Sequence, residues 1–437
     1  MLDTTTSSAR VHDSPTPVQD AIRRYGGGGP RRIAENAGIV VTHGEGNHLV
    51  DESGRRILDL ATAMGVAAFG HGHPRISAAI AAQQHRLNAT VLHTPEHAEY
   101  LQALASVVPY GLDRTALYSG GTEAVEVAVR LAQSVTGRRH LVSFTTAFHG
   151  KSTGLRYTGR RYASERAWLG VDWVHDVAYP VCEAHGVLDY ATCEEDGAGS
   201  LAELDRLAAG LDGGVAAVIV EPILGTAGNR PPHRHFLHGL RRLADERGWL
   251  LIADESITGM GRTGEWFAVE WFDVRPDVIV LGKALGGGFP LSGVAAGSEL
   301  WDASLFAERS ATSSSYGANP VACAAGLAVV DTIREDGILE NVRVTGERLG
   351  RGLAELATAS PYVRHARGVG LMLGFDLVDP STGALAGPDL SQELFAAILG
   401  EGVLLAQVPE VRVNAPLTLT ETEADFAVEA MTRALCR

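Results

Sequence analysis

The chain has 437 residues, enough for two or three core-bearing units, and its 45% hydrophobic and 20% charged residues are typical of a globular protein. A formal charge of −15 without any basic block makes nucleic acid and anionic membranes poor candidates as partners. The N-terminus lacks the apolar core of a signal peptide, and no apolar run approaches the roughly 20 residues of a membrane span.

The cysteines are few and widely scattered, without any CxxC spacing. This pattern predicts unpaired thiols, no zinc knuckle or other metal site, no disulfide framework and a cytoplasmic location. The four residues are Cys182, Cys193, Cys323 and Cys436.

In chain order, residues 1–30 are polar and end in four glycines and a proline, which predicts a flexible N-terminal arm. Residues 31–75 are expected to join residues 331–437 in a smaller α+β domain. Residues 76–330 are expected to form a large domain. Within it, from about residue 115, short β-rich runs alternate with helical stretches.

The β-rich runs are nearly unbroken apolar strands. They read HLVSF (140–144), VAAVIV (215–220), WLLIAD (249–254) and DVIVLG (277–282). After Gly121, apolar residues recur on one helical face up to Gly137, at positions 125, 128, 129 and 132. Such alternation predicts an α/β fold with a mostly parallel sheet covered on both faces, whose ligands bind at the carboxyl ends of the strands.

Two candidate site features follow strands in the first half of this region. In Ser119–Glu123, Gly120 and Gly121 let backbone N–H groups close on an anion at a helix N-terminus, and Thr122 adds a hydroxyl. A simple turn with a capping threonine fits this segment equally well. After HLVSF, Phe148 is placed to lie on a heteroaromatic ring, although a core role for it is the simpler reading.

Two further features follow later strands. Asp254 ends the run WLLIAD, where a buried carboxylate needs a partner such as a protonated pyridine nitrogen; an N-cap or a structural ion pair is the alternative. Lys283 follows DVIVLG, and burial there makes its amine nucleophilic, unless the side chain reaches solvent. Glycines 286–288 leave room for a bulky adduct.

These features stand in the order used by fold-type-I pyridoxal-phosphate enzymes, and the sequence resembles the class III (ω-, subgroup II) aminotransferases from about Gly38 to Ala434. The matching segments are GNHLVDESGRRILDL, GHGHP, SGGTEAVE, AFHGKS, EPILGTAG, LLIADESITGMGRTG, PDVIVLGKALGGGFP, SSSYGANPVACAAGLAV and VRVNAPLTLT. The resemblance implies a large domain with a mostly parallel seven-stranded sheet, the cofactor pyridoxal 5′-phosphate and a homodimer with its active sites at the subunit interface.

The resemblance also implies roles for single residues. Lys283 would form the internal aldimine, a Schiff base, and carry the proton, while Asp254 would pair with the ring nitrogen. Phe148 would stack on the ring, and Gly120, Gly121 and Thr122 would hold the phosphate. Ser315 stands where the family has a threonine that reaches the phosphate of the neighbouring subunit.

Three further departures from the family pattern involve four positions. Ser256 and Ile257 replace the usual Val-Gln pair at the cofactor ring, so Ile257 cannot donate the glutamine's hydrogen bond. Thr226 replaces the glutamate that masks the carboxylate-binding arginine, which survives as Arg412. Lys151 replaces an arginine that grips a carboxylate.

When a substrate without an α-carboxylate binds, Arg412 must therefore swing out of the site or pair with another acid. Glu221 is the nearest candidate in the motif. Lys151, Arg412 and Glu221 are accordingly the candidate substrate-binding residues.

The expected function is a two-stage transfer of an amino group between an amino-acid donor and an aldehyde or ketone of the ω-amine, diamine or amino-sugar type. Racemisation or epimerisation at an amine-bearing carbon is the alternative on the same scaffold, favoured by the loss of the glutamate and the glutamine. A non-catalytic relative is a third hypothesis, which the intact Lys283 and Asp254 oppose.

Overall fold

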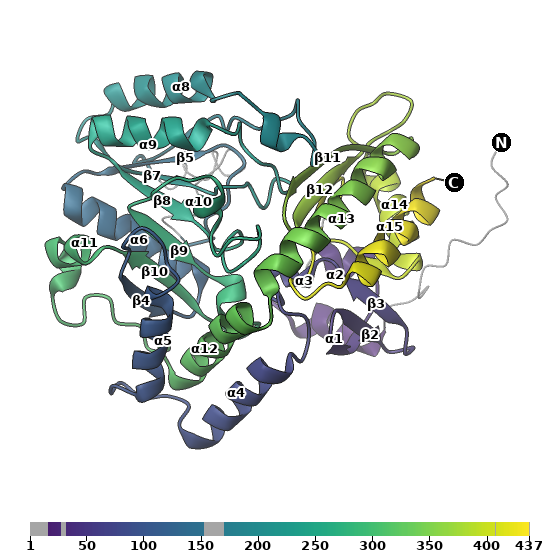
Figure 1. Ribbon diagram of the computed structural model, residues 1–437, viewed down its shortest axis with the longest axis horizontal. Coiled ribbons are helices and arrows are strands. Elements are labelled where there is room, and N and C mark those ends of the chain that lie inside the picture. The colour runs from purple at the N-terminus through teal and green to yellow at the C-terminus, as the bar shows by residue number, and fades with distance from the viewer. Residues whose placement is uncertain (1–15, 28–31, 153–169, 407, 437) are drawn as a thin grey trace.

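The computed structural model describes residues 16–27, 32–152, 170–406 and 408–436. Figure 1 shows a larger part built around one broad sheet and a smaller part that contains the C-terminal helices. In the described part of the chain, no helix is long and apolar enough to cross a membrane.

The larger part contains a seven-stranded sheet in the order β4-β10-β9-β8-β7-β5-β6. Strand β10 runs antiparallel to both of its neighbours, and every other pair is parallel, so the predicted fold class is confirmed. In chain order the strands are β4 (Arg114–Tyr118), β5 (His140–Phe144), β6 (Val174–Val177), β7 (Val215–Val220), β8 (Leu250–Asp254), β9 (Val278–Leu281) and β10 (Ser292–Ala296).

Helices cover both faces of this sheet because successive strand side chains point to opposite sides. In β7, Ala217 and Ile219 pack with α6, whereas Val218 and Val220 pack with α8 and α9. Helices α4, α5 and α12 form a third layer. This layer lies near β9 and β10, at the end of the larger part opposite α8 and α9 (Figure 1). These helices are α4 (Pro74–Arg86), α5 (Pro95–Ala105), α6 (Gly121–Thr136), α8 (Ala198–Ala209), α9 (Phe236–Arg247) and α12 (Pro320–Glu335).

Short elements complete the larger part. They are the helices α10 (Ala268–Trp271) and α11 (Ser298–Ala303) and the 3₁₀ turns η2 (Tyr190–Thr192), η3 (Lys283–Gly286) and η4 (Leu305–Ala307). Only Gly282 separates the end of β9 from turn η3, so the turn fixes the position of Lys283 relative to the end of the sheet.

The smaller part combines segments from both ends of the chain. One sheet has the order β1-β2-β3-β13, in which β13 pairs in parallel with β3, and a second has the order β11-β12-β14. This pairing confirms the predicted α+β domain built from N- and C-terminal segments. Its strands are β1 (Val41–Glu45), β2 (His48–Asp51), β3 (Arg56–Asp59), β11 (Val363–Val369), β12 (Met372–Leu377), β13 (Val403–Leu404) and β14 (Glu410–Asn414). Its helices are α2 (Arg32–Ala37), α3 (Thr62–Gly65), α13 (Ile338–Ala359), α14 (Pro388–Gly400) and α15 (Glu421–Leu435).

Part of the expected flexible arm is helical. Helix α1 (Pro17–Tyr25) begins after Thr16, whose hydroxyl accepts from the Gln19 N–H while the Gln19 side chain accepts from the Thr16 N–H. This reciprocal cap and the proline at the first turn explain why a polar segment forms a helix. None of its residues is buried, so it lies on the surface. Residues 1–15 and 28–30 of the predicted arm lie outside the described residues.

Candidate active site

Loops that follow strands β4, β5, β8 and β9 enclose a cavity of about 330 Å³ at the carboxyl edge of the large sheet. Parallel strands end at one edge, and for this reason residues distant in sequence meet there. Six of the predicted cofactor residues line the cavity, namely Gly121, Thr122, Phe148, Asp254, Ser256 and Lys283.

The start of α6 forms one wall of this cavity. Gly120 is the N-cap of the 16-residue helix, so the unpaired N–H groups of its first turn and the positive end of its dipole are available to an anion. Gly150 approaches this turn so closely that a Cβ there would lie 2.6 Å from Thr122 Oγ1, and its φ of +131° also favours glycine. The arrangement is a narrow cradle suited to a phosphate group.

Asp254 is buried at the end of β8 beside His149. Its Oδ2 lies 2.8 Å from His149 Nδ1, and its Oδ1 accepts from the Ser256 N–H at 3.1 Å. Burial would raise the pKa of Asp254, but the hydrogen bond and charge of His149, together with Lys283, lower it below its usual value. The pKa of His149 is raised, since this pairing outweighs the opposing effect of burial. Asp254 is therefore held as a carboxylate.

Lys283 occupies a strained position where β9 meets η3. Its φ of 44° lies in the left-handed region, which a lysine adopts at a cost, and such strain concentrates at functional sites. Burial lowers the pKa of its ammonium group, and the charge of Arg412 lowers it further, while Asp254 and Glu221 oppose the shift. A lysine with a lowered pKa more readily supplies a neutral, nucleophilic amine.

Glu221, at the end of β7, is buried behind the cavity. Its two carboxylate oxygens accept from the backbone N–H groups of Phe148, at 2.8 Å, and Gly225, at 2.9 Å. Burial raises its pKa, with a further contribution from Asp254, against the opposing effects of His149 and these two hydrogen bonds. The carboxylate thus braces the loop that carries Phe148.

Arg412, on β14, is buried and lacks a close carboxylate. Among the residues that the structure describes, no acidic oxygen lies within 4.0 Å of its guanidinium, and its Nε has no hydrogen-bond partner. Its Nη1 lies 3.6 Å from the sulfur of Met64 in the left-handed turn α3. Burial lowers its pKa, and the charge of Glu221 opposes that shift. Glu221 therefore acts on Arg412 through its charge, without forming an ion pair.

Ile257 and Thr226, two of the residues that depart from the family pattern, differ in their burial. Ile257 is buried, and its side chain fills the space beside Gly65 and Gly225, so it packs where a glutamine would have donated a hydrogen bond. Thr226 is half-buried in the loop after β7.

Five predicted site residues do not line the cavity within a single chain, namely Gly120, Glu221, Arg412, Lys151 and Ser315. Lys151 is exposed and does not line it, and Ser315 is exposed in the loop before α12. Lys151 lies two residues before the segment 153–169, which is outside the described residues.

Two residues of the site are not among those predicted from the sequence. His149 is the hydrogen-bond partner of Asp254. Gly150 follows it and shapes the cradle at Thr122. The string Phe-His-Gly-Lys after a buried strand could have indicated both residues. Only the fold shows that this loop faces the C-terminal end of β8 and the N-terminal end of α6.

Comparison with known proteins places this geometry in context. The family model described as class-III aminotransferase matches residues 31–435. An acetylornithine aminotransferase 1 of Bordetella pertussis is 35% identical over 403 residues, covering 90% of this chain and 94% of that protein. A 5-aminovalerate aminotransferase of Pseudomonas aeruginosa is 33% identical over 411 residues, covering 91% and 93%. The crystal structure of an amine transaminase from an uncultivated Pseudomonas species, in its PLP-bound form, superposes with a TM-score of 0.83 at 26% identity, covering 94% of this chain and 98% of that one.

Proposed function

Because the chain belongs to the class III aminotransferase family and is a pyridoxal-phosphate-dependent transaminase, we propose that it moves an amino group between an amino-acid donor and an aldehyde or ketone acceptor in two half-reactions. The names of the relatives, which include acetylornithine and 5-aminovalerate aminotransferases, favour an ω-amine over a diamine or an amino sugar as the second substrate.

The residues of the cavity fit the cofactor. The cradle of Gly120, Gly121 and Thr122, closed by Gly150, suits its phosphate, and the flat side chain of Phe148 suits its ring. The buried carboxylate of Asp254 suits a protonated pyridine nitrogen, and His149 holds that carboxylate in place. Ser256 lines the same cavity as a further cofactor contact.

When bound, pyridoxal phosphate withdraws electrons from the carbon that carries the amino group and so lets that carbon lose its proton. Lys283 is the residue placed to attach the cofactor covalently. Once the substrate amine has displaced Nζ from the cofactor, the freed Lys283 amine would take the proton from the substrate carbon and return it at the cofactor carbon to which Nζ had been bonded. Asp254 keeps the ring nitrogen protonated throughout.

The choice of an amino-acid donor rests on one observation. The guanidinium of Arg412 is buried and has no carboxylate within 4.0 Å among the described residues. A buried unpaired charge is costly, and a planar carboxylate would satisfy it in bidentate fashion. We therefore assign Arg412 to the α-carboxylate of the amino-acid donor and of the 2-oxo acid formed from it.

Arg412→Ala tests this assignment. We expect kcat/KM for the amino-acid or 2-oxo-acid partner to fall by about 10- to 150-fold, the equivalent of about 1.5–3 kcal/mol, while kcat/KM for a simple amine changes little. Steady-state kinetics of each half-reaction measures both values. An equal loss for both partners would instead make Arg412 a structural residue.

Spectroscopy of the cofactor with donor alone tests the reaction type. A transaminase converts the bound cofactor to its aminated form in the absence of acceptor. A racemase or epimerase would exchange the hydrogen on the amine-bearing carbon with solvent and leave the cofactor unchanged, and this result would overturn amino-group transfer by this chain.

We also propose a cytoplasmic homodimer. The single chain leaves Ser315 exposed and away from its own cavity, as expected if its hydroxyl reaches the phosphate bound by the neighbouring subunit. The four cysteines are free, which is typical of a reducing compartment. Lys151, exposed beside the same loop as Phe148, is proposed to contact the substrate.

A further inference from the structure

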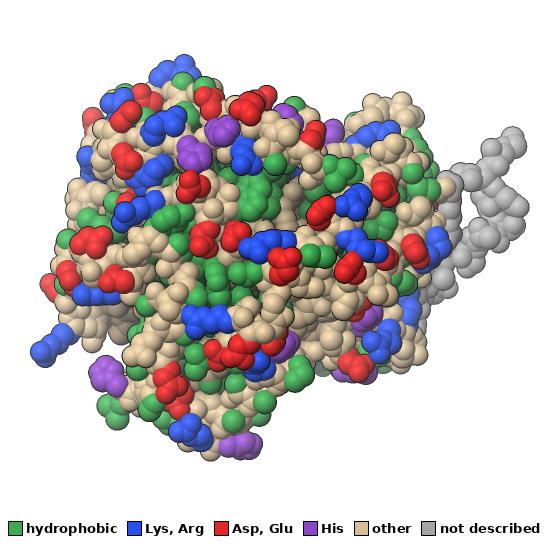
Figure 2. Space-filling model, in the orientation of Figure 1, with side chains coloured by type: hydrophobic (Ala, Val, Ile, Leu, Met, Phe, Trp, Pro, Cys, Tyr) green, Lys and Arg blue, Asp and Glu red, His purple; other side chains and the backbone are tan. Residues whose placement is uncertain are grey.

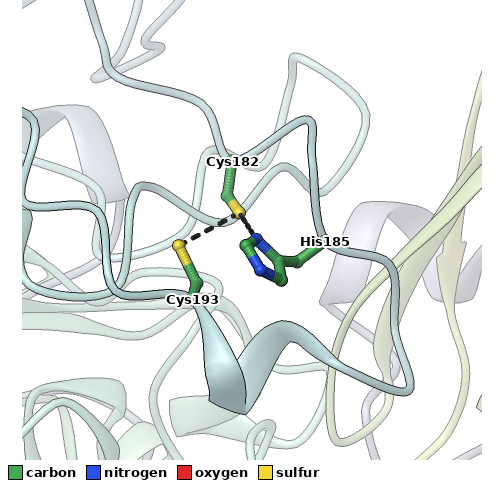
Figure 3. A group of neighbouring side chains, drawn as sticks. All are labelled: Cys182, His185 and Cys193. Atoms are coloured by element: carbon green, nitrogen blue, oxygen red, sulfur yellow. Dashed lines mark hydrogen bonds between the residues drawn. The ribbon is translucent and has the colours of Figure 1, made fainter.

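Three metal-binding side chains meet in the loop between β6 and α8, away from the cavity. Cys182 Sγ lies 3.4 Å from Cys193 Sγ and 3.5 Å from His185 Nδ1 (Figure 3). All three donor atoms lie within 4.8 Å of one another. Figure 3 shows the Cys182 sulfur between the Cys193 sulfur and the His185 ring, joined to each by a dashed line.

The sequence predicts no metal site, because no CxxC spacing is present. The three donors instead follow a Cys-x2-His-x7-Cys pattern within one loop. In the sequence alone, this spacing does not indicate a metal site. The three donors meet because the loop folds back on itself through the 3₁₀ turn η2, just before Cys193.

The separations of the Cys182 sulfur from the other two donors match those around a tetrahedral ion. Zinc bonds of about 2.3 Å to sulfur and 2.0–2.1 Å to nitrogen place neighbouring donors about 3.5–3.8 Å apart. Two thiols and an imidazole are also the ligand types that favour zinc over calcium or magnesium. We propose that Cys182, His185 and Cys193 bind one zinc-type divalent ion.

A disulfide explains the arrangement less well. It would join the two sulfurs at about 2.05 Å and leave the imidazole, which is equally close, without a role. Both sulfurs are buried, with exposed fractions of 3% for Cys182 and 0% for Cys193, while His185 is half-exposed. Solvent therefore reaches the centre from the His185 side, where a water molecule would complete the tetrahedron.

The ion would fasten a loop that contacts several other parts of the chain. The Val187 N–H donates to Ala366 of β11, in the smaller part, at 2.9 Å. The Tyr190 hydroxyl donates to the Pro232 carbonyl at 2.8 Å, and the Tyr190 ring stacks on Trp271. Binding of the ion by the folded loop would stabilise the loop conformation that makes these contacts.

The same loop also supports the wall of the active site. Tyr179, three residues before Cys182, donates its buried hydroxyl to the carbonyl oxygens of Glu221 at 3.0 Å and Pro222 at 3.2 Å. The role assigned to the ion is structural, and it does not depend on the identity of the transaminase substrates.

The test starts from holoenzyme purified without chelators and without a histidine tag. Elemental analysis should find one zinc per chain, and X-ray absorption at the zinc edge should show sulfur neighbours at about 2.3 Å and nitrogen at about 2.0–2.1 Å. Cys182→Ser and Cys193→Ser should lose zinc at least about tenfold more readily on dialysis. Cys323→Ser, at a buried cysteine elsewhere, is the matched control and should retain it.

Stability provides the second measurement. Removing the ion from wild type with a chelator should lower Tm by several degrees, and added zinc should restore it, because a ligand that binds only the folded state stabilises that state. Wild-type protein that neither contains zinc nor takes it up when zinc is added would overturn the proposal. Thiol counting that finds Cys182 and Cys193 joined in a disulfide in the purified enzyme would overturn it as well. Both results concern the wild type, so they are decisive even if a cysteine variant fails to fold.

Discussion

At the scale of single residues, the lysines are the most informative side chains. The chain contains only two, Lys151 and Lys283, so only these can form a Schiff base through a lysine amine. Lys283 lines the cavity beside Asp254, whereas Lys151 is exposed and outside it. The structure thereby supports the proposal that Lys283 anchors the cofactor.

Lys283→Ala should abolish turnover, because it removes both the covalent anchor and the proton carrier. Lys151→Ala is the matched control and should keep the cofactor attached, with its effect confined to substrate binding. Borohydride reduction followed by peptide mapping is the direct measurement, and wild type should carry the cofactor on the peptide of Lys283. An adduct on Lys151 would refute the proposed site.

Asp254→Asn should retain the cofactor but lose activity by about a hundredfold or more, because an amide cannot keep the ring nitrogen protonated. Glu255→Gln is a suitable control. Glu255 is equally buried but accepts from the Val269 N–H at 2.8 Å, away from the cavity, and burial raises its pKa to about 7. Cofactor content and kcat should be measured for both variants. Activity of Asp254→Asn within a few-fold of wild type would show that another group holds the nitrogen.

At the scale of elements, the sequence predicts buried strands and long amphipathic helices well. The run VAAVIV coincides with β7, and every one of its residues is buried. Burial on both faces of the sheet explains why the whole run is apolar. The helix expected after Gly121 is α6, which ends at Gly137 in the left-handed conformation, as a C-terminal glycine does.

What the sequence does not predict depends on contacts between distant segments. The pairing of His149 with Asp254 joins residues 105 positions apart, and no local pattern encodes it. The turn Thr62–Gly65 has positive φ at each residue, although only the last is a glycine. Its conformation is imposed from outside, since the Thr62 hydroxyl donates to the Asn414 carbonyl of β14 at 2.7 Å. Tertiary contacts here outweigh local preference.

The contact between two elements at Gly150 leads to a prediction about cofactor affinity. Gly150→Ala would place a methyl group 2.6 Å from Thr122 Oγ1 and force an alanine into a φ of +131°, a strain of about 1–3 kcal/mol. The cofactor dissociation constant should therefore rise by about 5- to 150-fold in a titration of apoenzyme. Gly199→Ala, in α8, is the control, because nothing lies within 4 Å of the added carbon there. Equal affinity in both variants would mean that the cradle does not hold the phosphate.

At the scale of the whole molecule, the proposed dimer accounts for apolar side chains that a single chain leaves in solvent. Val91 and Leu92, in the loop between α4 and α5, have exposed fractions of 99% and 75%, and Tyr316, next to Ser315, has 71%. Both loops adjoin the layer in which α12 packs on α4 and α5. Exposed apolar groups gathered beside one layer are typical of a protein–protein interface.

Leu92→Glu should therefore weaken the dimer, because it would bury an unpaired charge in the proposed interface. Light scattering after size exclusion should show dimeric wild type and a monomer fraction in the variant that grows on dilution. Cofactor occupancy should fall in parallel, since the phosphate would lose the hydroxyl that Ser315 supplies across the interface. Leu385→Glu changes an exposed leucine in the loop between β12 and α14, with an exposed fraction of 47%, and should leave the dimer intact. A wild-type monomer with full activity and full cofactor occupancy would contradict the dimer, and Ser315 would then have no part in the site.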